Sequence, residues 1–299
     1  MKTATRQLAI WVWLILGSWL SIQAKPLVDS NMLVTATQQY NYAKKIRYFK
    51  PDSALDLLNQ SYRQLLIDGD TAKAVYALKT AANIQGNLAQ YKEAYDKLWH
   101  ALSIADKADL KFIKAVLYID IGRHFSFYKR REKALEYFHV ALGISKKLVA
   151  DKVIPKSSLV FNYYAFCSTY RELDDFTLAR KYLDSCFQHA ALGNTPIKEA
   201  FLKFELGSIQ TAEKNYAEAL QTFESIQPWF EANDPTYLVL FYTYMSDALS
   251  GLGRFDQSEF YYKRALEISK EYNMHIDFSP IVHEKLALLH LTRGDLPAA

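Results

Sequence analysis

The chain has 299 residues, of which 50% are hydrophobic and 14% aromatic, and a formal net charge of +4. It is long enough for an extended core and too apolar for a disordered protein. Glycine is scarce at 10 residues, which argues against a βαβ nucleotide-binding sheet and a loop-rich all-β fold. No long run of alternating apolar and polar residues predicts strands. We therefore expect an all-α protein.

The first 24 residues differ in kind from the rest. Lys2 and Arg6 precede an almost wholly apolar run at residues 8–22, and a small residue, Ala24, stands just before Lys25-Pro26. This pattern is typical of a secretory signal peptide, here residues 1–24. The alternative is an uncleaved anchor with Trp residues at the bilayer interface, although the run is shorter than the ~20 residues of a spanning helix. Either way, we expect the remainder to be exported, as a periplasmic or membrane-anchored protein facing outside the cytoplasm.

Charge gives no indication of a nucleic-acid partner. Cleavage removes Lys2 and Arg6 and no acidic residue, so the net charge falls from +4 to +2. A near-neutral chain lacks the electrostatic footprint of nucleic-acid binding. We interpret the basic clusters at residues 44–47 and 129–131 as solvated helix faces and turns.

The first helical hairpin follows a short linker at residues 25–37. A first helix is expected at residues 38–48, and Pro51 starts its partner at residues 54–66. Proline is tolerated there because the first turn of a helix leaves its N–H groups unpaired. Asp68-Gly69-Asp70 ends the hairpin.

Similar hairpins recur along the chain, most clearly at residues 203–223. There Leu206-Gly207 lies on a first helix, Asn215-Tyr216 forms a turn, and Ala219 with Phe223 begins a second helix. The position equivalent to Ala219, which we call the register position, recurs at intervals of 40, 40, 45, 40, 39 and 41 residues. Its occupants are Ala54, Ala94, Ala134, Ala179, Ala219, Ser258 and Ala299. One such hairpin cannot bury its apolar face, so the recurrence predicts a stacked array over residues 38–299, with six hairpins and the first helix of a seventh.

These motifs resemble the tetratricopeptide repeat family. Leu206-Gly207 through Ala219 and Phe223 carry the resemblance, as does the stretch from Gly253 to Ala265. The resemblance implies a right-handed α-solenoid of stacked antiparallel helix pairs whose first helices line the concave face. The period of ~40 residues exceeds the family's usual ~34, so each helix is longer by about a turn or the links between repeats are longer.

A ligand-binding groove is expected along the first helices. Its candidate residues, which we call the groove residues, are Tyr76, Lys79, Asn83, Arg123, Phe127, Tyr164, Arg171, Phe204 and Asp247. An aromatic surface with two guanidinium groups suits a peptide or protein segment with apolar anchors and an acidic group or a free carboxylate. The alternative is that Phe161, Phe201 and Phe204 pack between adjacent helices as core.

Chaperone-tail binding is not expected from this groove. Lys79 and Asn83 look like the first pair of the carboxylate clamp of chaperone-binding family members. Asp120, Phe161 and Ala165 stand at the later clamp positions and remove most of that clamp.

The sequence lacks the motifs of common catalytic and metal sites. It contains no Gly-rich phosphate loop, no H-E-x-x-H and no cysteine pairs at metal spacing, so we expect no enzyme, no metal and no cofactor. Cys167 and Cys186 are offset along their hairpin by ~8–9 Å, beyond disulfide reach, which predicts two buried thiols.

Two functions remain open. The first is a non-catalytic exported scaffold that binds a peptide or protein segment, similar to the extracytoplasmic sensor part of bacterial membrane-bound regulators. The array ends after a first helix, which suggests truncation at Ala299 before a transmembrane and output region; membrane association would use that region or an uncleaved N-terminus. The second is a periplasmic or surface assembly scaffold that uses its convex face or its ends.

Overall fold

The computed structural model describes residues 35–48, 50–193, 197–234, 237–272 and 279–294. Within these ranges the chain forms α-helices and one short 3-10 helix, and no strand occurs. The signal-peptide prediction, most of the linker and the register position at Ala299 lie outside the described residues. None of the described helices combines the length and the hydropathy needed to cross a membrane.

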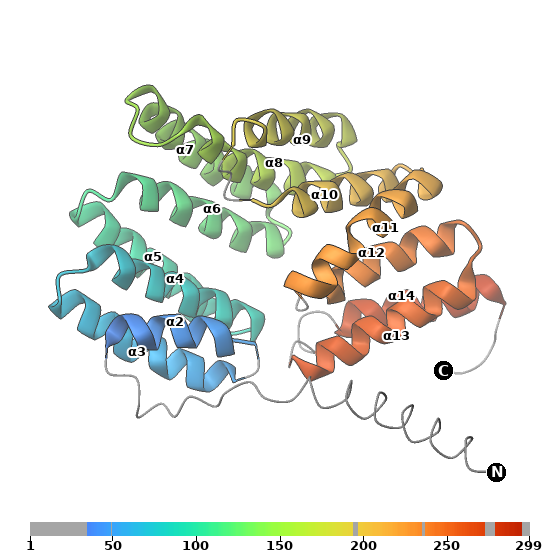
Figure 1. Cartoon of the computed structure of the whole chain (residues 1–299), viewed down its shortest axis with the longest axis horizontal. Helices are drawn as coiled ribbons and strands as arrows, with labels where there is room; N and C mark the ends of the chain where they lie inside the picture. The colour runs from blue at the N-terminus through green and yellow to red at the C-terminus, as the bar shows by residue number, and fades with distance from the viewer. Residues whose placement is uncertain (1–34, 49, 194–196, 235–236, 273–278, 295–299) are drawn as a thin grey trace, which may run out of the picture.

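Successive helices pair as antiparallel hairpins (Figure 1). The pairs are α2 (Ala36–Ile46) with α3 (Pro51–Ile67), α4 (Thr71–Asn87) with α5 (Tyr91–Lys107), α6 (Lys111–Phe127) with α7 (Arg131–Ala150), α8 (Val160–Glu172) with α9 (Phe176–Ala190), α10 (Glu199–Ala212) with α11 (Tyr216–Asn233), and α12 (Leu238–Gly251) with α13 (Phe255–Glu271). The 3-10 helix η2 (Lys156–Leu159) precedes α8, and α14 (Ser279–Arg293) follows α13.

The first helix begins two residues earlier than the sequence predicts. Thr35 accepts a hydrogen bond from the Gln38 N–H at 3.2 Å, and the Gln38 side chain accepts one from the Thr35 N–H at 3.0 Å. This reciprocal capping box satisfies two N–H groups that the helix leaves unpaired. The cap therefore places the start of α2 at Ala36.

The register positions all occupy the same place in their hairpins. Each of the six described ones is the fourth residue of a second helix and is fully buried. The paired helices are closely packed beside these positions: a Cβ on Gly207 would lie 2.7 Å from the Phe223 ring, and one on Gly122 would lie 2.4 Å from the Phe138 ring and 3.1 Å from the Ala134 carbonyl oxygen. The predicted hairpins are thus confirmed.

The long period arises in two ways. In the second and third hairpins, α4, α5 and α6 have 17 residues each and α7 has 20, whereas the links at residues 68–70 and 108–110 are short. The later first helices α8, α10 and α12 have only 13, 14 and 14 residues. There the extra length lies between hairpins, as at residues 191–198. Both expected explanations hold, each in a different half.

The turn inside the hairpin is the same in the second to sixth hairpins although its sequence varies. One residue adopts a positive φ in each of five turns: Ala89, Lys129, Asp174, Lys214 and Gly253. The next N–H then bonds to the carbonyl five residues back, as from Gln90 to Gln85 at 2.8 Å. This is a Schellman-type helix end. Only one of the five is glycine, so glycine spacing does not reveal the repeat.

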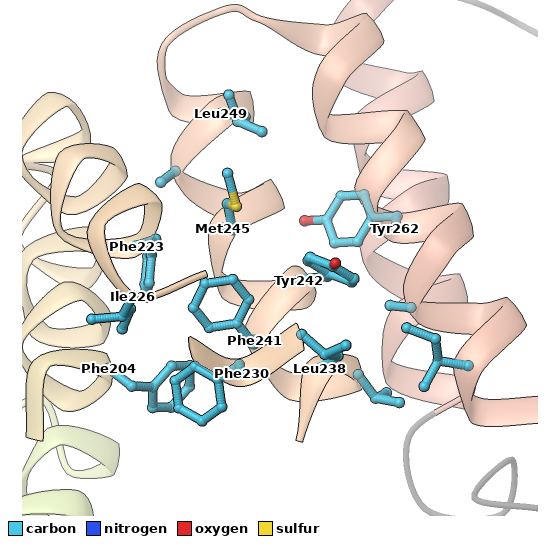
Figure 2. Close-up of a cluster of buried hydrophobic side chains, with 14 of the residues drawn as sticks. Phe204, Phe223, Ile226, Phe230, Leu238, Phe241, Tyr242, Met245, Leu249 and Tyr262 are labelled. Atoms are coloured by element: carbon cyan, nitrogen blue, oxygen red, sulfur yellow. The ribbon is translucent and has the colours of Figure 1, made fainter. Parts of the chain in front are cut away.

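The stack is held together by apolar clusters that run from hairpin to hairpin. The largest lies between α10, α11, α12 and α13 (Figure 2). Within it the ring of Phe230 lies 5.1 Å from that of Phe241. Cys167 and Cys186 are buried free thiols, as predicted. Partly buried residues that pack against two neighbouring clusters, such as Phe161 and Phe201, connect them along the array.

The array curves so far that its two ends meet. Tyr48, between α2 and α3, packs against the cluster of α10–α14. It also lines a small crevice together with Tyr272, which follows α13. Figure 1 accordingly shows α2 and α3 close to α13. The concave surface therefore lies inside an almost closed arc.

Candidate ligand-binding groove

A cavity of about 510 Å³ opens in the middle of the concave surface. Its lining comes from α6, α8, α10 and α12, all first helices, and from residues just before α10 and α12. Figure 1 shows the arrangement of these four helices. The lining residues are Arg123, Ser126, Phe161, Tyr164, Ser168, Thr169, Arg171, Glu172, Ile197, Lys198, Phe201, Glu205, Tyr237 and Leu240. The sequence-predicted groove thus contains a defined pocket.

A buried ion pair forms part of the lining. Arg171 on α8 donates through Nε to Oε2 of Glu205 on α10 at 3.0 Å, and through Nη1 to the Tyr244 hydroxyl at 2.6 Å. The Arg171 side chain is 11% exposed and that of Glu205 is 3% exposed. Burial alone would lower the pKa of Arg171, but Glu205, Tyr244 and Glu172 together outweigh it and hold that pKa well above its ordinary value. The charge of Arg171 is thus neutralised within the protein.

The walls between the charged groups are apolar or internally satisfied. Tyr164 and Tyr237 share a hydrogen bond between their hydroxyls, and burial raises the pKa of both. Phe201 packs edge-on against Tyr237, with ring centroids 4.9 Å apart. The Ser168 hydroxyl donates to backbone carbonyls of its own helix. The hydroxyl groups of these walls already have hydrogen-bond partners within the protein, and the aromatic rings offer an apolar surface to a ligand.

Arg123 is the accessible guanidinium of the pocket. Its side chain is 42% exposed, and its guanidinium lies over the Phe161 ring at 5.2 Å. The nearest acid, Asp120, is 3.6 Å from Nη1 of Arg123 but only 3.1 Å from Nζ of Lys79. The single negative charge of Asp120 is therefore shared between Lys79 and Arg123, and the positive charge of Arg123 is only partly neutralised.

The rim carries a second cation. Lys198, immediately before α10, is exposed, and no described acidic residue pairs with it. The acid on the rim, Glu172, is already engaged, because its Oε2 accepts from the Ser126 hydroxyl at 3.1 Å and from Arg131 Nε at 3.4 Å. The pocket is consequently electropositive at Arg123 and Lys198.

The structure brings only some of the groove residues together. Arg123, Tyr164 and Arg171 line the cavity. Tyr76, Lys79 and Asn83 lie on α4, outside it. Asp247 lies on α12, where it accepts hydrogen bonds from Tyr262 and from Lys285. The side chain of Phe127 is not among the described ones.

Phe204 requires a correction. Its side chain is fully buried and packs on Phe223, Phe230 and Phe241. The core alternative therefore holds for this residue, whereas Phe161 and Phe201 are only partly buried and do reach the pocket. Phe204 cannot contact a groove ligand without disruption of the core.

The pocket also contains residues that the sequence did not indicate. Lys198 and Tyr237 directly precede α10 and α12. The groove residues are predicted from their helical spacing relative to the packing residues. That procedure selects positions in the middle of a helix and misses residues that precede its first turn. Glu205 was missed because an acid adjacent to Leu206-Gly207 reads as solvent-facing. An acidic residue on the next first helix, 34 residues after a predicted groove arginine, is the sequence signal that could have found it.

The described residues show no group of three or more His, Cys, Asp or Glu side chains arranged to hold a metal ion.

Comparisons with known proteins agree on the fold. Residues 241–272, in α12 and α13, match the tetratricopeptide repeat family model. No curated protein matches the sequence. The family match thus covers one repeat of the array.

Three solved structures resemble the whole array. The apo form of RapI has a TM-score of 0.58 at 15% identity, with 89% of this chain and 92% of that chain covered. A Rap protein complexed with competence and sporulation factor has a TM-score of 0.58 at 16% identity, covering 86% and 75%. NprR in complex with its cognate peptide NprX has a TM-score of 0.59 at 14% identity, covering 99% and 85%. The fold is that of tetratricopeptide-like helical solenoids.

Proposed function

We propose that this chain is a non-catalytic repeat scaffold that binds a peptide or protein segment in its concave groove. The observation that carries the proposal is the pocket between α6, α8, α10 and α12, with its aromatic walls and the exposed Arg123. Its volume of about 510 Å³ lies within the ~300–1,000 Å³ of known ligand sites, which combine apolar walls with a few polar groups. The similar NprR structure holds its cognate peptide NprX, which supports a peptide as the ligand class.

The competing function is an assembly scaffold that holds partners on its convex face. Exposed apolar residues occur there too, including Trp99 on α5 and Val140 on α7, which are 36% and 46% exposed. These residues lie on second helices and line no cavity as large as the groove pocket. Among the described surfaces, the groove is therefore the better candidate for specific recognition.

A pair of matched substitutions separates the two functions. Leu240→Arg places a long charged side chain in the pocket, and Val140→Arg places the same side chain on the convex face. A peptide selected on the wild-type protein from a random display library should lose nearly all binding to Leu240→Arg and keep its affinity for Val140→Arg. Thermal unfolding of both variants checks that each is folded. The groove hypothesis fails if Leu240→Arg binds normally, or if Val140→Arg is the variant that loses the partner.

We also propose that the chain is exported and forms the sensor part of a membrane-associated signalling or transcription regulator. The basic and apolar N-terminal segment at residues 1–24 supports export. Residues 1–30 fused to an alkaline phosphatase without its own leader should give active enzyme outside the cytoplasm, and Leu14→Arg in the apolar run should prevent this. Equal activity of the two fusions would refute export through this segment.

A further inference from the structure

The charges around the pocket do not cancel. Arg171 is paired with Glu205, Arg131 with Glu172, and Lys79 is the closer partner of Asp120. After these pairs are removed, Arg123 and Lys198 remain as cations without a full partner among the described residues. A ligand that complements this surface must therefore bring negative charge.

The two cations lie on opposite sides of the cavity. Arg123 is on α6 and Lys198 precedes α10, and α8 packs between these helices. Axes of packed helices are ~8–10 Å apart, so those of α6 and α10 are separated by at most roughly 16–20 Å, and by less where the array curves. The aromatic cavity is lined by α8 and lies between the two cations, so a ligand segment that crosses it can meet one cation on each side. Two separate carboxylates on that segment can then pair with the two cations.

The cavity between them favours an apolar side chain. Phe161, Phe201 and Leu240 contribute hydrocarbon, and the Tyr164 and Tyr237 hydroxyls bond to each other. A polar group placed against these walls would lose its hydration without gaining a partner. The middle of the ligand segment is thus apolar, and its flanks are acidic.

We propose that the groove recognises an internal protein segment in which a large apolar or aromatic side chain is flanked on both sides by acidic residues. This rests on the proposed function and specifies its ligand class. The apolar side chain fills the cavity, and the two acids contact Arg123 and Lys198. A free C-terminal carboxylate supplies only one of the two charges, so a chain terminus is not the favoured source.

Selection from a display library of random segments of about 12 residues, presented internally so that no terminus is free, tests the composition. Segments enriched on the wild-type protein should carry acidic residues on both sides of a large apolar residue. Segments enriched on the Arg123→Gln/Lys198→Gln double variant should keep the apolar residue and lose the acids. Enrichment of segments with no acid, or with one acid only, on the wild-type protein would overturn the proposal.

Double-mutant cycles then test the contacts. Each flanking Asp or Glu of a selected segment is replaced by its amide and measured against Arg123→Gln and Lys198→Gln. Removal of either cation should weaken binding about three- to tenfold, and one acid should couple to Arg123 and the other to Lys198. Arg264→Gln is the matched control, because Arg264 on α13 also forms an exposed i,i+3 ion pair and lies outside the pocket. It should not change the affinity.

Two results distinguish the failure of this proposal from that of the proposed function. If selected segments bind and are lost with Leu240→Arg, but their acids couple to neither cation, the groove function stands and the acidic ligand class is wrong. If no segment binds the wild-type protein better than Leu240→Arg, both fail. A synthetic segment with one apolar residue at a free C-terminus that matches the affinity of the internal acidic segment would also contradict the proposal.

Discussion

Arg171 and Glu205 form an ion pair beneath the groove that joins α8 to α10, with 3.0 Å between Nε and Oε2. Arg171 also donates to Tyr244 on α12, so one side chain connects three consecutive first helices. The sequence indicates a ligand-binding arginine at this position. In the structure its charge is used internally to hold the floor of the pocket, and Arg123 is the guanidinium left for a ligand.

Loss of one partner from this pair should destabilise the array. Arg171→Met leaves the Glu205 carboxylate buried without its cation, which costs about 3–5 kcal/mol in the free energy of unfolding. The double variant Arg171→Met/Glu205→Leu removes both charges and should recover most of that loss. Chemical denaturation measures both effects. A stable Arg171→Met protein that has lost ligand binding would instead assign Arg171 to the ligand.

Two glycine-to-alanine substitutions should act in opposite directions. Gly207→Ala places a methyl group 2.7 Å from the Phe223 ring, so overpacking should cost about 1–3 kcal/mol. Gly143 lies on an exposed face of α7, and a Cβ added there would meet no neighbouring atom within 4 Å. Gly143→Ala should therefore stabilise the protein by about 0.5–1 kcal/mol through helix propensity. Equal effects of the two changes on thermal unfolding would show that the close α10–α11 packing is not rigid.

These packing contacts explain how much of the fold the sequence could predict. A small residue four positions into each second helix is visible in the sequence because helix pairing excludes larger side chains there. The pocket depends instead on contacts between hairpins, such as Arg171 with Glu205 and Arg123 with Phe161. Those pairings depend on the angle at which successive hairpins stack. Residue spacing within one hairpin does not determine that angle. For the same reason the sequence pattern places Phe204 in the groove, although it lies in the core.

Stability should fall as the pH drops towards 5, partly because of His124. Burial lowers the pKa of His124, although the nearby Asp120 raises it. Because its folded pKa is below the unfolded value of ~6.5, the unfolded chain binds more protons in this range, and stability is lost as pH falls below ~6.5. His124→Leu should make the dependence of unfolding free energy on pH shallower between about pH 7 and 5. His283→Leu, at an exposed site on α14, is the control and should leave the slope unchanged. If the unfolding free energy of His124→Leu depends on pH as steeply as that of the wild-type protein, His124 does not contribute to this pH dependence.

The contact between the array ends should restrain the arc. Tyr48→Ala removes the side chain that packs against the C-terminal cluster. Spin labels at Gln60→Cys and Lys270→Cys, in a protein whose two native cysteines are alanine, report the distance between α3 and α13 by pulsed electron paramagnetic resonance. We expect a longer and broader distance distribution for Tyr48→Ala than for the parent. Phe260→Ala, which removes an exposed ring of α13, should not change it. Identical distributions for Tyr48→Ala and the parent would show that the ends stay together without this residue.

Hydrogen–deuterium exchange with and without a selected peptide tests most directly whether the concave pocket is the binding site. Bound peptide should slow exchange in α6, α8, α10 and α12, most strongly near Arg123, Tyr164 and Phe201, and leave the outer faces of α5, α7 and α9 unchanged. Protection confined to those second helices, with the four pocket helices unaffected, would contradict groove binding.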